Sequence, residues 1–285
     1  MLRPCTEREC EKYIDFVYDL AADRSRSGYP IYSDGIKTKE MFEKRSKKAF
    51  SSDSEEILLF VYEGVTEGRI HYYFFSEDKY LSAESFCISH HTEQALREFL
   101  EYAREHFKGY DLYLGYPSDN KRAVDFLAAN GFELLEESFN NTAFLDNYKP
   151  TTTDDDLVRI TEENFDLFRI IHGNADPDMY WNSDRIRSNI ENWSIFVVLR
   201  GGEACGSVYY TPVGDGWFEI FGIDMKDNVH DGEVLCDLLR GALNTAKEQG
   251  GKYVTFFCGE RERDIAEALG FVCAGGYVCY RMHIE

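Results

Sequence analysis

The sequence predicts an α/β protein built from two copies of one domain, each a mixed, mainly antiparallel sheet with helices on both faces. Five apolar residues at one helical spacing recur 139 positions later, and the same shift carries Gly131-Phe132 onto Gly270-Phe271. A repeat of this length indicates a duplicated domain, because solenoid repeats have periods of roughly 20–50 residues. The chain length of 285 residues agrees, since one domain takes about 150 residues. The repeated positions are Leu96, Phe99, Leu100, Ala103 and Phe107, then Leu235, Leu238, Leu239, Ala242 and Ala246.

The first half begins with two helices. A capping box at Thr6 to Glu9 and an apolar face from Tyr13 to Ala21 predict the first, and apolar residues around Met41 and Phe42 predict the second. The later elements are expected as strands at 57–62, 69–75 and 80–89, the repeated helix at 92–107, a strand at 111–116, a helix at 120–130 and a closing pair of strands over 132–145. The strands on either side of the repeated helix should lie parallel, because a crossover helix joins them.

A polar stretch at 150–156 without apolar periodicity predicts the linker between the halves. The expected domains are therefore residues 1–149 and 155–285. The order then recurs, with a strand at 157–160, a helix that begins at Thr161, a helix at 184–193, strands at 195–199, 204–211 and 217–224, the repeated helix at 231–249, a strand at 252–258, a helix at 262–269 and closing strands over 271–284.

The charge of the chain excludes one class of function. A formal net charge of −21 argues against nucleic acid as a main partner, because phosphate contacts need Lys and Arg. Such a surface attracts a cationic acceptor or simply keeps the protein soluble. The segment 24–48 is locally basic, and it either contacts phosphates or a partner or forms a solvated helix face.

Eight cysteines without a CxxC pattern predict buried, reduced thiols and a cytoplasmic protein. No stretch approaches the roughly 18 apolar residues of a membrane span, so we expect no membrane association. Adjacent histidines on a strand point to opposite faces, so His90 and His91 together with His71 do not predict a metal site.

Several local patterns carry a family resemblance. Cys5-Thr6-Glu7 and Ile160-Thr161-Glu162 open the two halves, residues 120–132 read NKRAVDFLAANGF, and residues 268–271 read ALGF. With the order of elements, this resembles the GNAT superfamily of acyl-CoA-dependent N-acyltransferases over nearly the whole chain, as two domains in tandem. The resemblance implies an N-acetyltransferase that uses acetyl-CoA as co-substrate and acetylates an amine of a small molecule or peptide.

In that family one strand splays from its neighbour, and acetyl-CoA inserts its pantetheine arm into the gap. The loop after this strand holds the pyrophosphate at a helix N-terminus through backbone N–H groups. Glu84 and Leu96 are 12 positions apart, whereas Glu219 and Leu235 are 16 apart, so the first copy has a shorter loop and is expected to be degenerate. The resemblance then assigns cofactor binding to Ile223, Met225, His230, Gly232, Glu233, Val234 and Leu235, with Asn120 at the start of the late helix in the first copy.

The second loop departs from the family pattern. Its single glycine is out of register, and Asp227, Asp231 and Glu233 place negative charge where a pyrophosphate would lie. Gly232 is equally explained by loop flexibility. The tyrosine that the family often uses as a general acid is replaced by Leu127 and Ala266.

The family often has a carboxylate on the splayed strand as the general base, which makes Glu219 and Asp224 the candidates in the second copy. Glu219 also fits a strand-edge carboxylate that points to solvent, and Asn120 fits a helix N-cap. The alternative function is a non-catalytic pair of GNAT folds that bind a small molecule or a protein.

Overall fold

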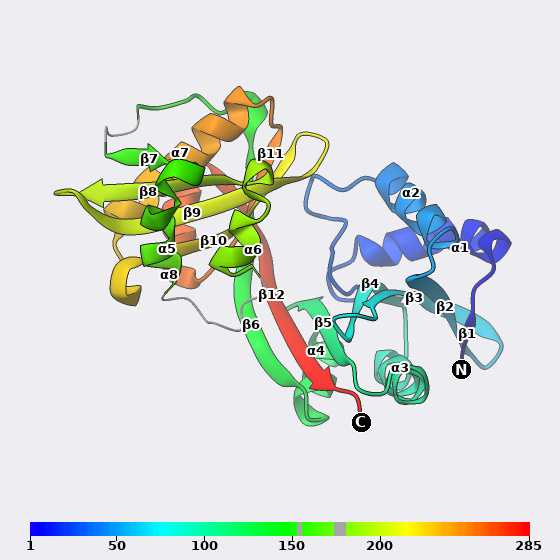
Figure 1. Cartoon of the computed structure of the whole chain (residues 1–285). Helices are drawn as coiled ribbons and strands as arrows, with labels where there is room; N and C mark the ends of the chain where they lie inside the picture. Colours follow the sequence, from blue (N-terminus) through cyan, green and yellow to red (C-terminus); the bar gives the residue numbers. More distant parts are fainter. Residues whose placement is uncertain (153–155, 174–180) are drawn as a thin grey trace. The chain divides into compact units, whose positions relative to one another are not determined.

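The computed structural model describes residues 1–152, 156–173 and 181–285, so positions 153–155 of the predicted linker lie outside the described residues. The chain forms two compact units (Figure 1). Unit 1 contains Met1–Ser138 and Gly275–Glu285, and unit 2 contains Phe139–Ala274.

Unit 1 is a mixed sheet with two helices on each face. Its strands follow the order β1 (Leu2–Pro4), β2 (Glu55–Tyr62), β3 (Val65–Phe75), β4 (Tyr80–Ile88), β5 (Asp111–Pro117) and the last part of β12 (Phe271–His283). Only β4 and β5 are parallel within this unit. The helices are α1 (Glu7–Ala21) and α2 (Lys39–Ala49) on one face, and α3 (Thr92–His106) and α4 (Lys121–Ala129) on the other. The alternation of β2 shows the division, because Leu58 packs with α3 and α4 while Ile57 packs under α1 and α2.

Unit 2 repeats this plan. Its strands follow the order β7 (Leu157–Arg159), β8 (Ser194–Arg200), β9 (Glu203–Gly214), β10 (Trp217–Met225), β11 (Tyr253–Cys258) and the last part of β6 (Glu133–Phe144). Helices α5 (Phe165–His172) and α6 (Ser183–Arg187) cover one face, and α7 (Gly232–Glu248) and α8 (Glu260–Ala268) cover the other. The mixed sheet with helices on both faces, predicted for each half, is confirmed.

The repeated helices are α3 and α7. Leu96 and Leu235, the positions that define the repeat, are both fully buried. Each lies in the core between its helix and the sheet of its own unit. The apolar face read from the sequence is therefore the face that each helix turns toward its sheet.

The division of the chain differs from the predicted domains 1–149 and 155–285. Each expected closing pair of strands is one long strand, β6 or β12, whose last part completes the sheet of the other half. Residues 139–144 pair with β11, and residues 277–283 pair with β5. The polar linker is thus a connection inside unit 2, because both β6 after Phe139 and β7 belong to that unit.

Candidate functional site

Strands β10 and β11 of unit 2 separate part of the way along their length. Their parallel register runs from Trp217 to Ile220 on β10 and ends there. A β-bulge follows between Ile220 and Gly222, after which β10 continues in register with β9. A cavity of about 460 Å³ lies where the strands diverge. Its lining comes from β9, β10, η4 (Lys226–Asn228), α7, β11 and α8 and comprises Tyr209, Phe221, Gly222, Ile223, Asp224, Met225, Asn228, His230, Leu235, Phe256, Phe257, Cys258, Gly259 and Glu262.

Half of the predicted site residues line this cavity. They are Ile223, Asp224, Met225, His230 and Leu235. Ile223 and Met225 also pack against the core beneath α7, so the alternation of β10 turns Asp224 to the opposite face, toward α5.

The remaining predicted residues have other places. Glu219 precedes the bulge, in register between Thr211 and Thr255, and it does not line the cavity. Val234 is buried in the core, and Gly232 lies against α8, where an added Cβ would be 3.2 Å from Ile265 Cδ1. Close packing against α8 therefore accounts for a glycine at position 232, without loop flexibility or phosphate contact.

Asp224 forms a pair that the sequence did not predict. Its Oδ2 is 2.7 Å from Nδ1 of His172, the last residue of α5, and the other ring nitrogen is 2.9 Å from the Trp181 carbonyl oxygen. His172 therefore bridges the Asp224 carboxyl group and the Trp181 carbonyl oxygen, one at each ring nitrogen. Phe168 stacks on the His172 ring at 4.7 Å and fixes its plane. No sequence pattern links the two, because 52 positions separate them.

Two other polar groups in the cavity stay protonated. Burial, with the charge of Asp224, raises the pKa of Tyr209 well above its usual value. Burial raises the pKa of Cys258 to about 12, with the charge of Glu262 adding to it. Cys258 is therefore a neutral thiol and is not activated as a nucleophile.

The N-terminus of α7 is capped by the carboxylate of Asp231. Its Oδ1 accepts hydrogen bonds from the backbone N–H of Glu233 at 3.0 Å and of Val234 at 3.2 Å. These are among the amides that a pyrophosphate would need at this helix end. Glu233 and Val234 therefore already donate to the chain's own anion.

The cations near the cavity are few. None of its described lining residues is Lys or Arg. Lys226 on the neighbouring loop pairs with Glu203 at 2.8 Å, and His230 is 3.5 Å from Glu262. The cavity is therefore apolar with an acidic edge, formed by Asp224 and Glu262.

The matching opening in unit 1 is filled by the chain itself. The parallel register of β4 and β5 ends at Ser82, and a bulge follows between Ala83 and Ser85. Residues 26–29, here called the filling segment, hydrogen-bond to both strands beyond that point. The bonds are Gly28 N–H to Phe86 O at 2.7 Å, Ile88 N–H to Arg26 O at 3.1 Å and Tyr29 N–H to Gly115 O at 2.8 Å. A ligand that adds to these strands would have to displace this segment.

Asn120 holds the filling segment and does not lie with the cavity residues of unit 2. It is buried in unit 1, where its amide nitrogen donates to the Ser27 carbonyl oxygen at 3.0 Å. Its amide oxygen accepts from the Ala123 N–H at 3.3 Å, which is the N-cap bond of α4. The capping interpretation of Asn120 is thus observed, and its amide nitrogen is occupied by a carbonyl oxygen of the chain itself.

Two kinds of site are not found in the part of the chain that the structure describes. No cluster of three or more His, Cys, Asp or Glu residues there has the arrangement that holds a metal ion. No described helix combines the length and apolar character needed to cross a membrane.

Solved structures with the same fold include GCN5-related N-acetyltransferases. One from Sphaerobacter thermophilus is 13% identical, with a TM-score of 0.62 over 100% of this chain and 96% of that one. A tandem GNAT protein from the clavulanic acid biosynthesis pathway is 12% identical, with a TM-score of 0.53 over 99% and 98%. A GCN5-related N-acetyltransferase from Kribbella flavida is 14% identical, with a TM-score of 0.51 over 76% of this chain and 88% of that one. No family model and no curated protein matches the sequence.

Proposed function

We propose that this chain, which has the GNAT fold twice in tandem, is an acetyl-CoA-dependent N-acetyltransferase whose active site is in unit 2. The observation that carries the proposal is the divergence of β10 from β11 at the Phe221 bulge, with Asp224 and its partner His172 at the edge of the resulting cavity. Backbone amides of residues 221–225 would bind the pantetheine arm as an added strand. The free cysteines in a reduced state fit the expected cytoplasmic setting.

The residues of the cavity have distinct roles in this reaction. Asp224, oriented by His172, takes a proton from the acceptor ammonium. The amine nitrogen then attacks the thioester carbonyl carbon, so that a C–N bond forms and the C–S bond breaks. The leaving thiolate takes a proton from the Tyr209 phenol, which burial keeps protonated, and the resulting tyrosinate takes the second proton of the nitrogen as the amide forms. The acidic edge favours a cationic amine as acceptor.

Asp231 opposes the diphosphate of the cofactor and favours the second candidate, a binding protein without catalysis. The filling of unit 1 favours it as well. The two candidates differ in one measurable property, the binding of acetyl-CoA. We expect weak binding in the natural chain, because the diphosphate must displace the Asp231 carboxylate from α7.

The test is Asp231→Asn, which keeps a good N-cap and removes its charge. One charge removed about 6 Å from a phosphate near the surface is worth about 1 kcal/mol, so acetyl-CoA should bind about fivefold more tightly by calorimetry at low salt. Asp227→Asn is the control, because this loop carboxylate has the same charge and does not cap the helix. An increase of similar size in both variants would indicate a general charge effect and not the cap.

Catalysis is tested separately. Asp224→Asn should leave the acetyl-CoA affinity unchanged and lower the acetylation rate of a polyamine or amine-bearing peptide about 100-fold, as expected for loss of a general base. If neither the natural chain nor the Asp231→Asn variant binds acetyl-CoA at millimolar concentration, the transferase proposal is wrong and the binding-protein candidate stands.

A further inference from the structure

A guanidinium is buried in unit 1 without a carboxylate partner among the described residues. Arg69 on β3 is 1% exposed, and its Cζ lies 4.4 Å from the ring centroid of Phe42. Its Nη1 donates to Cys10 Sγ at 3.2 Å, and its Nη2 donates to Ser46 Oγ at 2.6 Å. A buried, permanently charged group needs an anion nearby, and among the described residues the only ionisable group that it contacts by a hydrogen bond is the Cys10 thiol.

Cys10 has a second cysteine beside it. Thr6 is the N-cap of α1, so Cys5 and Cys10 occupy the positions before the cap and at the fourth helical residue, whose side chains pack together at helix starts. Both cysteines belong to one buried cluster beneath α1 and α2, and the Cys5 thiol donates to the Thr6 carbonyl oxygen at 3.3 Å. The second sulfur is therefore placed where it can react with the first.

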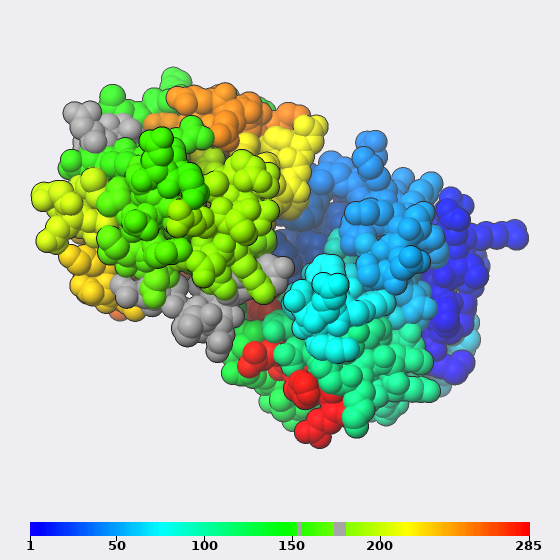
Figure 2. Space-filling view, viewed as in Figure 1, coloured from blue at the N-terminus to red at the C-terminus, as the bar shows by residue number. Residues whose placement is uncertain are grey.

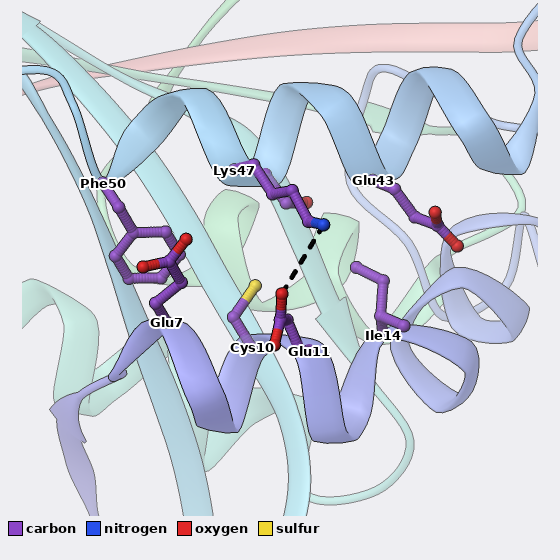
Figure 3. Close-up of a pocket in the computed structure, with 8 residues that line it drawn as sticks. Glu7, Cys10, Glu11, Ile14, Glu43, Lys47 and Phe50 are labelled. Atoms are coloured by element: carbon purple, nitrogen blue, oxygen red, sulfur yellow. Dashed lines mark ion pairs between the residues drawn. The ribbon is translucent and has the colours of Figure 1, made fainter.

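Cys10 also lines a cavity of about 240 Å³ between α1 and α2. Both helices lie at the surface of unit 1 (Figure 2). Figure 3 shows the sulfur of Cys10 pointing toward α2, with Glu11 and Lys47 paired across the cavity at 3.5 Å. Glu7 and Glu43 stand at its two sides. A small neutral molecule fits this space, whereas three carboxylates against one ammonium oppose an anion.

We propose that Cys10 is a peroxide-reactive thiolate and that Cys5 and Cys10 form a reversible disulfide, so that the start of α1 is a redox modification site. The thiolate sulfur attacks one oxygen of a hydroperoxide; an S–O bond forms and the O–O bond breaks. The departing oxygen takes a proton and leaves as water or an alcohol, so Cys10 is oxidised to a sulfenic acid while the peroxide is reduced. Cys5 then loses its proton and attacks the Cys10 sulfur; the S–S bond forms, and hydroxide leaves as water with that proton.

The electrostatic surroundings of the two sulfurs agree with this order of events. The neighbouring Cys5 thiol and then the charge of Arg69 lower the pKa of Cys10 below its usual value, against burial and the charge of Glu11. The charge of Arg69 also lowers the pKa of Cys87 on the same face, yet burial raises that pKa to about 12. The neighbouring Cys5 thiol and the direct contact with the guanidinium therefore distinguish Cys10 from the fully buried Cys87. The other charged groups facing it are Glu7, Glu43 and Lys47.

The experiment is peroxide titration of the full chain followed by peptide mass spectrometry. Trypsin cuts after Arg8 and Lys12, so the disulfide would join peptide 1–8 to peptide 9–12. We expect this species to be the first oxidation product. If Cys205 and the other partly exposed cysteines oxidise while the pair stays reduced, the proposal is wrong.

Variants separate the two steps. Cys5→Ser should leave Cys10 as a sulfenic acid that dimedone traps, and Cys10→Ser should leave Cys5 reduced. Arg69→Met should slow oxidation about 10-fold, because an ordinary thiol is only a few per cent ionised at pH 7. Arg97→Met is the matched control, since this exposed arginine also contacts a phenylalanine ring in unit 1 but no thiol.

A measurement on the natural chain covers the case in which Arg69→Met does not fold. The alkylation rate of Cys10 should level off near pH 7 to 8, and neutral iodoacetamide should react faster than anionic iodoacetate once their intrinsic rates are divided out. A rate that still rises tenfold per pH unit up to pH 8.5 would show an ordinary thiol and would overturn the proposal.

Discussion

Asn120→Ala tests whether this residue has two structural roles in unit 1. The first role is the N-cap of α4, whose loss costs about 1 kcal/mol of unfolding free energy. The second is the hydrogen bond to the carbonyl oxygen of Ser27, which is fully buried. A buried acceptor left without its donor lowers the free energy of unfolding by about 1–3 kcal/mol more. The variant should therefore lose about 2–4 kcal/mol, more than a cap alone can explain.

Thr38→Ala provides the matched control in the same unit. Thr38 caps α2 by accepting from the Met41 N–H at 3.3 Å, and its side chain is exposed. Its loss should cost about 1 kcal/mol, so the difference between the two variants measures the Ser27 bond. Both values come from urea unfolding followed by circular dichroism.

Amide hydrogen exchange adds a local measurement. Without Asn120, the N–H groups of Gly28 and Tyr29 should exchange faster, because the filling segment is less firmly held between β4 and β5. Asn120 has no second structural role if Asn120→Ala costs no more unfolding free energy than Thr38→Ala and these two amides keep their protection. Acetyl-CoA binding should be the same in both variants, since neither residue belongs to unit 2.

Two further variants test the packing of unit 2 and the titration of unit 1. Gly222→Ala should destabilise the protein by about 1–3 kcal/mol in thermal unfolding, because the added Cβ would lie 2.2 Å from the Tyr209 hydroxyl. Gly214→Ala is the control and should be tolerated, because its Cβ would lie 3.4 Å from Trp217. Burial, then the charge of Arg45, lowers the pKa of His71 to about 3. The unfolded chain therefore binds one more proton than the folded chain between pH 6.5 and 3. The free energy of unfolding falls as the pH falls through that window, by at most about 1.4 kcal/mol per pH unit. His71→Gln should remove this share of the slope in urea titrations at pH 4 to 7, and an unchanged slope would contradict the assignment.

The helices and strands were predictable because their periodicity is local. The capping box of α1 and the buried faces of α3 and α7 lie where the sequence predicts them. The pairing of each closing strand with the sheet of the other half was not predictable, because β6 and β12 have patterns that suit either sheet. Their pairing depends on partners more than 100 positions away for β6 and more than 150 for β12.

Some residues of the candidate site could likewise be predicted from the sequence, and others could not. Ile223 and Asp224 were predicted because they lie at the end of the splayed strand in the sequence. His172 and Tyr209 come from other elements, and only the fold brings them to Asp224. The locally basic segment 24–48 fits neither of its two interpretations completely. Its first residues fill unit 1, and Arg45 pairs inside the unit with Glu55 and with Glu84 at 3.1 Å.

In both units the chain's own hydrogen bonds occupy groups that a cofactor would need, and the free energies of these bonds differ between the units. In unit 1 a ligand would have to replace three backbone hydrogen bonds and the Asn120 contact, which together are worth about 4 kcal/mol. In unit 2 it would have to replace one side-chain cap of about 1 kcal/mol, and rotation of Asp231 is enough to release the two amides. A difference of about 3 kcal/mol corresponds to about 100-fold in affinity. We therefore expect a thioester ligand that adds to the sheet by its strand-like arm to bind unit 2, even though the two sheets have the same bulge and the same divergence of strands.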